Sequence, residues 1–274
     1  MTTLILTILF TALGGILSVL AAGVFLLLPE QQRQRLLPHG ISFATGALLT
    51  GAFCSLIPHA FEKVSVDQMP GLSATILIGI LSFFVLEKLL VWRHCHSHSC
   101  AAHGEDAHDH HHHHNAQADQ QRRVAGLFII LGDSIHNFVD GVLIGAAFLT
   151  DPQLGMVTSL AVAAHEIPQE VGDFAILLHS GYTRSKALLY NVLASMATVL
   201  GGILAFFSLG DLDGILPYFL AMAASSFIYI AVADLIPSLH EKTDIKTSLQ
   251  QIGFILAGVM LILLIQNVAH HFEG

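Results

Sequence analysis

Eight stretches of predominantly apolar residues, each about twenty residues or longer, follow one another along this chain. They cover residues 3–28, 40–61, 71–92, 124–149, 154–180, 186–209, 214–240 and 248–270. About twenty apolar residues in an α-helix span the hydrocarbon core of a bilayer. The composition agrees, because only 11% of the residues are charged, whereas a soluble domain has roughly a quarter. The sequence therefore predicts an all-α integral membrane protein with eight transmembrane helices in one domain, residues 1–274.

Basic residues are distributed unevenly between the loops that join these helices. The loops after helices 1, 3, 5 and 7 contain Arg33, Arg35, Arg93, Arg122, Arg123, Arg184, Lys186, Lys242 and Lys246. The other loops contain only Lys63. Because loops rich in Lys and Arg stay in the cytoplasm, we expect both termini on the extracytoplasmic side and the long loop between helices 3 and 4 inside.

Two segments at the ends of helices 2 and 7 are similar to each other. Residues 55–63 read SLIPHAFEK and residues 234–242 read DLIPSLHEK, with five of nine positions identical. In the predicted topology they end on opposite sides of the membrane, and inverted repeats of this kind are typical of transporters. The sequence thus predicts an inverted repeat of helices 1–3 and 6–8 around helices 4 and 5, with chance similarity as the alternative.

Helices 4 and 5 carry polar side chains where a bilayer disfavours them. At 100° per residue, they cover an arc of about 100° on helix 4 and about 140° on helix 5. They are Asp133, His136, Asn137 and Asp140 on helix 4, and His165, Glu166, Gln169, Glu170 and Asp173 on helix 5. Each ionisable group costs several kcal/mol in a membrane unless it is paired, hydrated or bound to a cation.

Neither set contains Lys or Arg, so internal ion pairs with these residues cannot neutralise the carboxylates. A bound divalent cation is the simplest neutraliser, and a self-satisfied hydrogen-bond network is the alternative. Imidazole and carboxylate ligands suit zinc, iron(II), cobalt or manganese, while the absence of thiols argues against copper(I). With a net charge of −9 and no basic stripe, the chain has divalent metal ions and the lipid bilayer as its expected partners, and no nucleic acid.

Two motifs carry a resemblance to a known family. Residues 136–141, HNFVDG, followed by residues 165–174, HEIPQEVGDF, resemble the ZIP (Zrt/Irt-like protein) family of metal transporters, in particular the branch with a HExPHExGDF-type fifth helix. The resemblance covers essentially the whole chain, because it includes eight helices, outside termini and a histidine-rich loop between helices 3 and 4. It implies a two-metal site midway through the membrane, built from helices 4 and 5.

The resemblance also implies ligands for that site. They are His136, Asn137 and Asp140 on helix 4, and His165, Glu166 and the position of Gln169 on helix 5. Gln169 departs from the pattern, because that branch often has a second histidine there. Since glutamine is a weaker, neutral ligand, we expect either looser binding of the metal or compensation by Glu170.

Further polar residues flank this site and are candidates for the metal pathway. They are Asp133 and Asp173 beside the site, Asp234 deeper in helix 7, His59, Glu62, His270 and His271 at predicted outer helix ends, and His179 and His240 at predicted inner ends. A carboxylate within a transmembrane helix is by default a pathway ligand or a proton carrier. For the residues at helix ends, simple placement at the membrane surface is the alternative.

The long loop, residues 93–123, is rich in histidine. It contains His94, His96, His98, His103, His108 and His110 to His114, together with Cys95 and Cys100. Because it has almost no large apolar residues, we expect a disordered cytoplasmic segment. Multiple weak nitrogen ligands suit metal buffering or sensing better than one defined site.

These features predict a transporter, not an enzyme, that moves Zn²⁺ into the cytoplasm, with Fe²⁺, Mn²⁺, Co²⁺ or Cd²⁺ as further substrates. The alternative is an intramembrane metal-dependent hydrolase that activates water at the same cluster, although helix 5 lacks the HExxH protease motif. A metal-sensing receptor would need a signalling domain, which the loops do not offer. The short loops favour a multi-pass protein of a prokaryotic inner membrane, with eukaryotic organelle membranes as the alternative, and a homodimer is compatible with this hypothesis.

Overall fold

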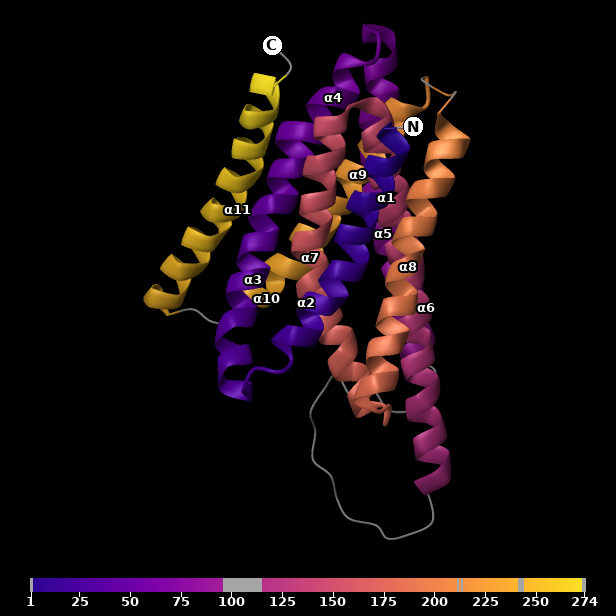
Figure 1. The fold of residues 1–274 in the computed structure, drawn as a ribbon, viewed down its shortest axis with the longest axis vertical. Helices are drawn as coiled ribbons and strands as arrows, with labels where there is room; N and C mark the ends of the chain where they lie inside the picture. Colours follow the sequence, from indigo (N-terminus) through magenta and orange to yellow (C-terminus); the bar gives the residue numbers. More distant parts are fainter. Residues whose placement is uncertain (1, 96–114, 211, 213, 241–243, 273–274) are drawn as a thin grey trace.

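The computed structural model describes residues 2–95, 115–210, 212, 214–240 and 244–272, which form helices and connections with no strand among them. The helices lie side by side along the vertical direction of Figure 1. In chain order they are α1 (Thr2–Ala12), α2 (Ser18–Phe25), α3 (Glu30–Thr50), α4 (Ile57–Glu62), α5 (Met69–Cys95), α6 (Asn115–Thr150), α7 (Pro152–His179), α8 (Arg184–Leu209), α9 (Leu216–Tyr229), α10 (Ile236–Leu239) and α11 (Ile245–Phe272).

These helices make the eight passes that the sequence predicts. Three passes are continued by π-helical segments, Leu13–Leu17 between α1 and α2, Gly51–Leu56 between α3 and α4, and Ile230–Leu235 between α9 and α10. Seven passes are long and apolar enough to cross a membrane. The eighth, α7, runs among them and is less apolar because it carries the polar residues of the predicted site. The predicted all-α membrane fold is confirmed.

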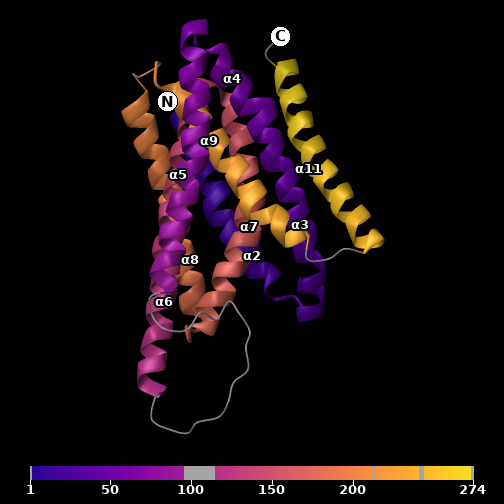
Figure 2. The ribbon, with the colours of Figure 1, turned by 180° about the vertical axis from the view of Figure 1, so that it is seen from behind.

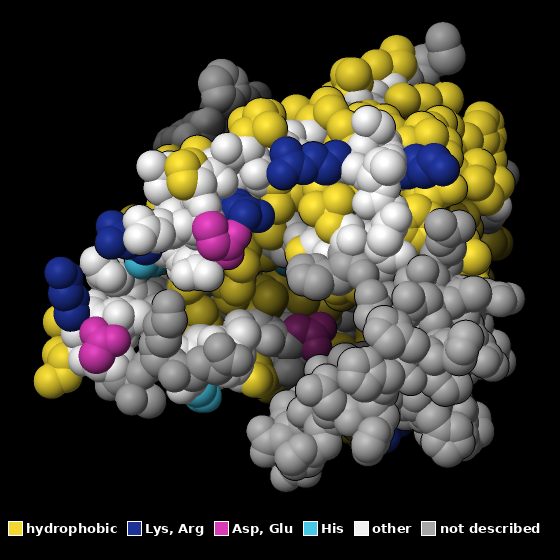
Figure 3. All heavy atoms as spheres, turned by 90° about the horizontal axis from the view of Figure 1, so that it is seen from below, with side chains coloured by type: hydrophobic (Ala, Val, Ile, Leu, Met, Phe, Trp, Pro, Cys, Tyr) yellow, Lys and Arg dark blue, Asp and Glu magenta, His cyan; other side chains and the backbone are white. Residues whose placement is uncertain are grey.

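The two ends of the bundle differ in charge. α1 begins and α11 ends at the upper end in Figure 1, as an even number of passes requires. Figure 3 views the opposite end, where Lys and Arg side chains gather. Arg33, Arg184 and Lys246 lie there, because each is in the first turn of a helix that starts at that end. The asymmetry is the one that the loop charges predict, and the assignment of this end to the cytoplasm stays a prediction.

The central helix, α7, has strong start and stop signals. The carboxylate of Asp151 accepts hydrogen bonds from the backbone N–H groups of Gln153 and Leu154, at 2.8 and 3.0 Å, and Pro152 occupies the first turn, where no N–H is needed. Beyond its other end, Gly181 has φ +85°, a conformation that favours glycine. α7 packs against α2, α3, α6 and α8, so its polar face is enclosed by other helices.

The predicted inverted repeat has a structural counterpart. The π-helical segments Gly51–Leu56 and Ile230–Leu235 are related by an offset of 179 residues, and a proline follows each at the same distance, Pro58 and Pro237. In Figure 1 the chain rises from α3 to α4 and descends from α9 to α10, so the two copies run in opposite directions. Proline lacks an N–H and frees a carbonyl one turn earlier.

Helix pairing follows the same offset. Ser225 on α9 donates a hydrogen bond to the carbonyl of Ile76 on α5 at 3.0 Å. At the positions 179 residues away, Gly46 on α3 lies against the carbonyl of Ile255 on α11, so closely that a Cβ would approach that oxygen to 2.1 Å. The pairs α5–α9 and α3–α11 therefore pack in equivalent registers, which supports the repeat beyond the nine similar residues.

Glycines bring α6 and α8 into backbone contact. A Cβ at Gly141 would lie 1.9 Å from the carbonyl oxygen of Thr198, and a Cβ at Gly201 would lie 2.2 Å from that of Phe138. Small residues allow helices in membranes to approach closely and gain packing energy. This contact fixes the position of Thr198 on α8 relative to α6.

The histidine-rich segment lies largely outside the described residues. α5 runs to Cys95 and α6 begins at Asn115, so helices extend into both ends of the predicted loop, residues 93–123. Residues 96–114 are not described. The predicted disorder and metal buffering of this segment therefore stay predictions.

The α6–α8 contact predicts a specific sensitivity to added volume. Gly141→Ala should destabilise the protein by about 1–3 kcal/mol, because the methyl group overlaps a backbone oxygen that cannot move freely. The apparent melting temperature of the purified protein in detergent measures this. The matched control is Gly172→Ala, where nothing lies within 4 Å of the new Cβ. Equal melting temperatures for the two variants would contradict the close contact.

Candidate metal centre

Four side chains from α6 and α7 converge on one point inside the bundle. Nε2 of His165 lies 3.2 Å from Oδ2 of Asp140 and 3.4 Å from Oε1 of Glu166. Nε2 of His136 lies 3.4 Å from the same oxygen of Glu166, 3.7 Å from Oδ2 of Asp140 and 3.4 Å from Nε2 of His165. Asp140, His165 and Glu166 are buried. These four residues form what we call the imidazole cluster.

The spacing within the imidazole cluster fits a tetrahedral metal. Zinc takes histidine nitrogen and carboxylate oxygen at about 2.0–2.1 Å, so that four tetrahedral ligands lie about 3.3–3.4 Å from one another. The five separations given above, from 3.2 to 3.7 Å, bracket this value. Five of the six separations between ligand atoms that a tetrahedral ion requires are thus close to their expected value.

His165 is held in the tautomer that a metal needs. Its Nδ1 lies 3.1 Å from the backbone carbonyl of Ala161, and a carbonyl can only accept, so Nδ1 carries the proton. Nε2 is then left with a free lone pair that faces the cluster. A ligating histidine typically donates its other N–H in this way, which fixes the ring and raises its basicity.

The carboxylates of the site lack other partners. Both carboxylate oxygens of Asp140, Glu166 and Glu170 are buried, with no hydrogen-bond partner among the described residues. Leaving a buried charge unpaired is costly, and buried polar groups are normally hydrogen-bonded. The nearest polar neighbours of these oxygens are the imidazoles of His136 and His165 and, for Glu170, the side chain of Asn191, and the self-satisfied hydrogen-bond network stays the alternative.

A second group of carboxylates adjoins the first. Oxygens of Asp133, Glu166 and Glu170 lie within 4.8 Å of one another, so Glu166 belongs to both groups. Asn137, which the family resemblance names as a ligand, is fully buried. Its amide N–H₂ donates to the backbone and side-chain oxygens of Asp133, at 3.1 and 2.8 Å, and its oxygen accepts from Thr198 at 2.7 Å.

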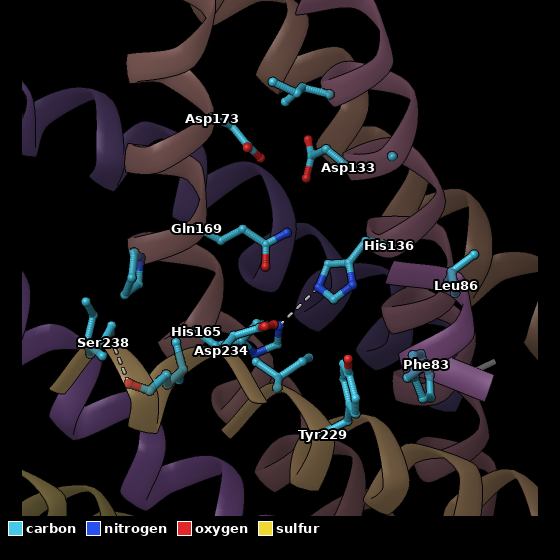
Figure 4. A pocket seen from close by; sticks show the side chains of 16 residues that line it. Phe83, Leu86, Asp133, His136, His165, Gln169, Asp173, Tyr229, Asp234 and Ser238 are labelled. Atoms are coloured by element: carbon cyan, nitrogen blue, oxygen red, sulfur yellow. Dashed lines mark hydrogen bonds between the residues drawn. The ribbon is translucent and has the colours of Figure 1, made fainter. Parts of the chain in front are cut away.

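A cavity of about 500 Å³ leads away from the imidazole cluster. Figure 4 shows Asp133 and Asp173 pointing toward one another from α6 and α7, with Gln169 and His136 directed into the same space. Asp234 and Ser238 also line the cavity, and no Lys or Arg is among its lining residues. Figure 3 shows the end of the bundle where basic residues gather to be hollowed, with an acidic side chain at depth.

The opposite side of the cluster is closed by packed apolar side chains. Leu48, Ala161 and Phe227 are fully buried in one continuous cluster, and the rings of Phe227 and His165 are 6.3 Å apart. Ala161 lies one turn before His165 on α7, toward the end of the bundle at which α1 begins. A packed apolar cluster therefore lies beside the imidazole cluster on the side toward the N-terminal end of α7.

The residues predicted along the pathway are distributed over both ends. Asp133, Asp173 and Asp234 line the cavity beside the cluster, together with Gln169. His59 and Glu62 line a separate cavity of about 400 Å³ between α4, α7 and α11. His240 is exposed at the end of α10. The side chains of His179, His270 and His271 lie outside what the structure describes.

α8 contributes polar side chains to the site that the sequence patterns on the other helices do not predict. The hydroxyl of Thr198 fixes the amide of Asn137, and Asn191 lies beside Glu170. Asn191, Ser195 and Thr198 are all buried, at spacings of four and three residues, which place them on one helix face. That stripe of polar residues in an apolar helix is the signal that could have identified them.

The comparisons with known proteins agree with this architecture. The model of the ZIP zinc transporter family matches residues 1–266. Zinc transporter ZIP13 of Homo sapiens is 31% identical over 260 residues, covering 82% of this chain and 69% of the relative. Zinc transporter ZIP13 of Pongo abelii is 30% identical, covering 82% and 65%.

Zinc transporter ZIP4 of Homo sapiens is 30% identical over 252 residues, covering 74% of this chain. The chain spans 39% of the length of that relative and about two thirds of the two ZIP13 proteins. The family match extends over nearly the entire chain, and it agrees with the resemblance carried by the motifs on α6 and α7. The chain belongs to the ZIP family of zinc transporters.

Proposed function

We propose that the protein carries Zn²⁺ across a membrane and that the ion binds in the imidazole cluster. The observation that carries this proposal is the convergence of two imidazole nitrogens and two carboxylate oxygens at tetrahedral spacing inside a membrane bundle. The relatives described above are named as zinc transporters. The substrate in the names of these relatives and the chemistry of the cluster agree.

The cavity suggests how the ion leaves the cluster. Because the cavity reaches the end of the bundle where Lys and Arg gather, the structure has the shape of an inward-facing state if that end is cytoplasmic. His136 is 22% exposed in its side chain, whereas Asp140, His165 and Glu166 are 1% exposed or less. An ion released toward the cavity passes His136 first and then the carboxylates of Asp173 and Asp234. We infer net movement into the cytoplasm, with these residues along the exit.

The hydrolase alternative finds less support. A catalytic zinc site keeps one coordination position open for water, whereas four protein ligands fill a tetrahedral shell. The imidazole cluster provides four ligands from this chain alone. A closed shell suits an ion that is itself the cargo, bound without its water and then released.

Metal range, assembly and membrane are finer parts of the proposal. The mixed nitrogen and oxygen ligands also accommodate Fe²⁺, Mn²⁺, Co²⁺ or Cd²⁺, and a homodimer is compatible with the apolar outer helices. The relatives described above are from animals, so they give the predicted prokaryotic inner membrane no support. That placement remains an expectation from the short loops.

Neutralising one ligand should weaken zinc binding and abolish zinc flux. Asp140→Asn keeps the size of the side chain but replaces a charged ligand by a weak one, so we expect zinc affinity to fall about tenfold or more and zinc uptake into proteoliposomes to be lost. The matched control is Asp67→Asn, an exposed aspartate outside the bundle core, which should behave as wild type. Wild-type flux in Asp140→Asn would refute the assignment.

Zinc binding should weaken as the pH falls. An imidazole binds a metal only when it is neutral, and a free imidazole has a pKa near 6.5. Protons compete with the ion for these nitrogens, so zinc affinity should decrease as the pH falls from about 7.5 to 5.5. Equilibrium binding in detergent measures this without interference from proton gradients. A flat profile would mean that carboxylates alone hold the metal.

Restoring the family histidine should change metal preference. Gln169 lines the same cavity as His136 and His165, so Gln169→His places a third imidazole beside the site. Zinc affinity should then rise by a larger factor than manganese affinity, because imidazole favours the borderline metal. Paired titrations of the variant and the wild type with both metals provide the comparison. Unchanged zinc affinity would show that this position does not reach the ion.

A further inference from the structure

A second cavity, of about 400 Å³, lies at the end of the bundle at which α1 begins. The segment Gly51–Leu56, α4, the start of α7 and the last turns of α11 line it, and none of the described residues that line it is Lys or Arg. Cys54, His59 and Glu62 line it together. Thiolate, imidazole and carboxylate are the side-chain groups that bind zinc in proteins. We call this space the thiol cavity.

The π-helical segment helps to bring the thiol and the imidazole to one side of the chain. Cys54 lies in the segment Gly51–Leu56, in which hydrogen bonds join residues five apart. Residues five apart in an α-helix point in directions that differ by about 140°, whereas a π-helical turn places them nearly above one another. His59 follows Cys54 by five positions. Glu62 follows His59 by three, which is the spacing of neighbours on an α-helix face.

His59 is held with one nitrogen free for a metal. Its Nδ1 lies 2.8 Å from the backbone carbonyl oxygen of Ser55. Because a carbonyl oxygen only accepts, Nδ1 carries the proton and the lone pair of Nε2 is left for another partner. His165 of the imidazole cluster is fixed by the same kind of contact, with the carbonyl four residues earlier. Ligating histidines typically have their second nitrogen held in this way.

α7 contributes an amide to the same cavity. Nε2 of Gln153 is buried and has no hydrogen-bond partner among the described residues, although such groups in proteins are normally paired. Rotation of the amide by 180° exchanges its nitrogen and its oxygen, and the oxygen is an acceptor with two lone pairs. A cation in the cavity would therefore give this amide a partner, with the oxygen as a neutral ligand.

Charge and volume of the thiol cavity fit one divalent cation. The thiolate of Cys54 and the carboxylate of Glu62 together carry two negative charges, which balance the charge of the ion. A thiol gives up its proton, here to water, when it coordinates a metal. Three ligands leave one of four tetrahedral positions, which the oxygen of Gln153 can take. Since one water molecule occupies about 30 Å³, an ion can enter the cavity with part of its hydration shell.

The thiol cavity and the imidazole cluster have separate sets of side chains. The cavity beside the imidazole cluster and the thiol cavity share no lining residue. Val157, the lining residue of α7 nearest in sequence to His165, precedes it by about 12 Å along the helix axis at 1.5 Å per residue. Ala161 lies between them on α7 and is fully buried. An ion in the thiol cavity is therefore bound independently of the imidazole cluster.

We propose that Cys54, His59 and Glu62 bind one soft or borderline divalent cation, Zn²⁺ or Cd²⁺, in the thiol cavity, with the amide oxygen of Gln153 as the fourth ligand. The site goes beyond the proposed function, because it shares no residue with the imidazole cluster. Thiolate selects soft and borderline metals, whereas a site of imidazole and carboxylate also accommodates Mn²⁺. The end of the bundle at which α1 begins thus discriminates between metals more strongly than the imidazole cluster does.

Protection of the thiol from alkylation tests this on the purified full-length protein in detergent. Cys95→Ser and Cys100→Ser are introduced first, so that Cys54 is the one remaining cysteine of the chain. Buffered Zn²⁺ or Cd²⁺ should slow the reaction of Cys54 with iodoacetamide about tenfold or more, because the free thiolate is the reactive form. Mn²⁺ at the same free concentration should change the rate by less than about twofold.

Loss of the other ligands should raise the zinc concentration that gives half protection. His59→Gln and Glu62→Gln should each raise it about tenfold, and Gln153→Ala should raise it by a smaller factor. Asp67→Asn, which removes an exposed acidic group elsewhere, is the matched control for Glu62→Gln and should leave it unchanged. Asp140→Asn in the imidazole cluster should also leave protection of Cys54 intact, because the two sites share no ligand.

Cadmium provides a spectroscopic readout of the bond to sulfur. Cadmium bound by a thiolate absorbs in the ultraviolet through charge transfer from sulfur to the metal, so this absorption should appear on titration with Cd²⁺ and be absent in Cys54→Ser. A merely structural effect of the metal on the thiol would not produce it.

Three results would overturn the proposal. They are a rate of alkylation that Zn²⁺ does not change, equal protection in the double variant His59→Gln/Glu62→Gln, and protection that disappears in Asp140→Asn. In the last case the thiol would report a change of shape caused by zinc in the imidazole cluster. Absence of zinc flux in a protein whose Cys54 is protected as expected would instead reject the proposed function and leave this site in place.

Discussion

Buried carboxylates need compensation, and the rest of this structure is arranged around that requirement. Asp140, Glu166 and Glu170 are fully buried in a membrane bundle without hydrogen-bond partners among the described residues. In such surroundings an ionised carboxylate is stable beside a cation or in contact with water. α7 supplies two of these carboxylates and has to be enclosed by other helices, which explains why the least apolar pass of the bundle is the central one.

The enclosure of α7 depends on how closely the surrounding helices approach one another. Gly141 and Gly201 allow the backbones of α6 and α8 to touch, and that contact brings the hydroxyl of Thr198 to Asn137. Asn137 in turn holds Asp133. A chain of contacts thus connects the close packing at Gly141 to the orientation of the Asp133 carboxylate. A substitution that separates α6 from α8 should therefore also disturb the site.

The eight passes and the polar faces of α6 and α7 follow from local features of the sequence, namely the length of apolar runs and the 100° rotation per residue. The division of those faces into two groups does not, because it depends on which carboxylate oxygens meet across the α6–α7 interface. Glu166, one residue after His165, is one predicted ligand among several in the sequence, whereas in the structure it belongs to both groups. The role of Thr198 is harder still to predict from the sequence. Thr198 and its hydrogen-bond partner Asn137 are 61 positions apart and meet only because α6 and α8 pack together.

The inverted repeat explains why one fold can present different chemistry at its two ends. At the end that holds α4, the carbonyl of Cys54, freed by Pro58, accepts a hydrogen bond from Gln266 of α11 at 3.1 Å, so this kink is satisfied within the protein. In the other copy Asp234 takes the place of Ser55 and lines the open cavity beside the metal cluster. The backbone kink is the same in both copies, because a π-helical segment and a proline occur in the same register. A polar side chain from a neighbouring helix occupies one kink, and a carboxylate at the other lines the cavity beside the imidazole cluster. The symmetry of the backbone is therefore broken by its side chains.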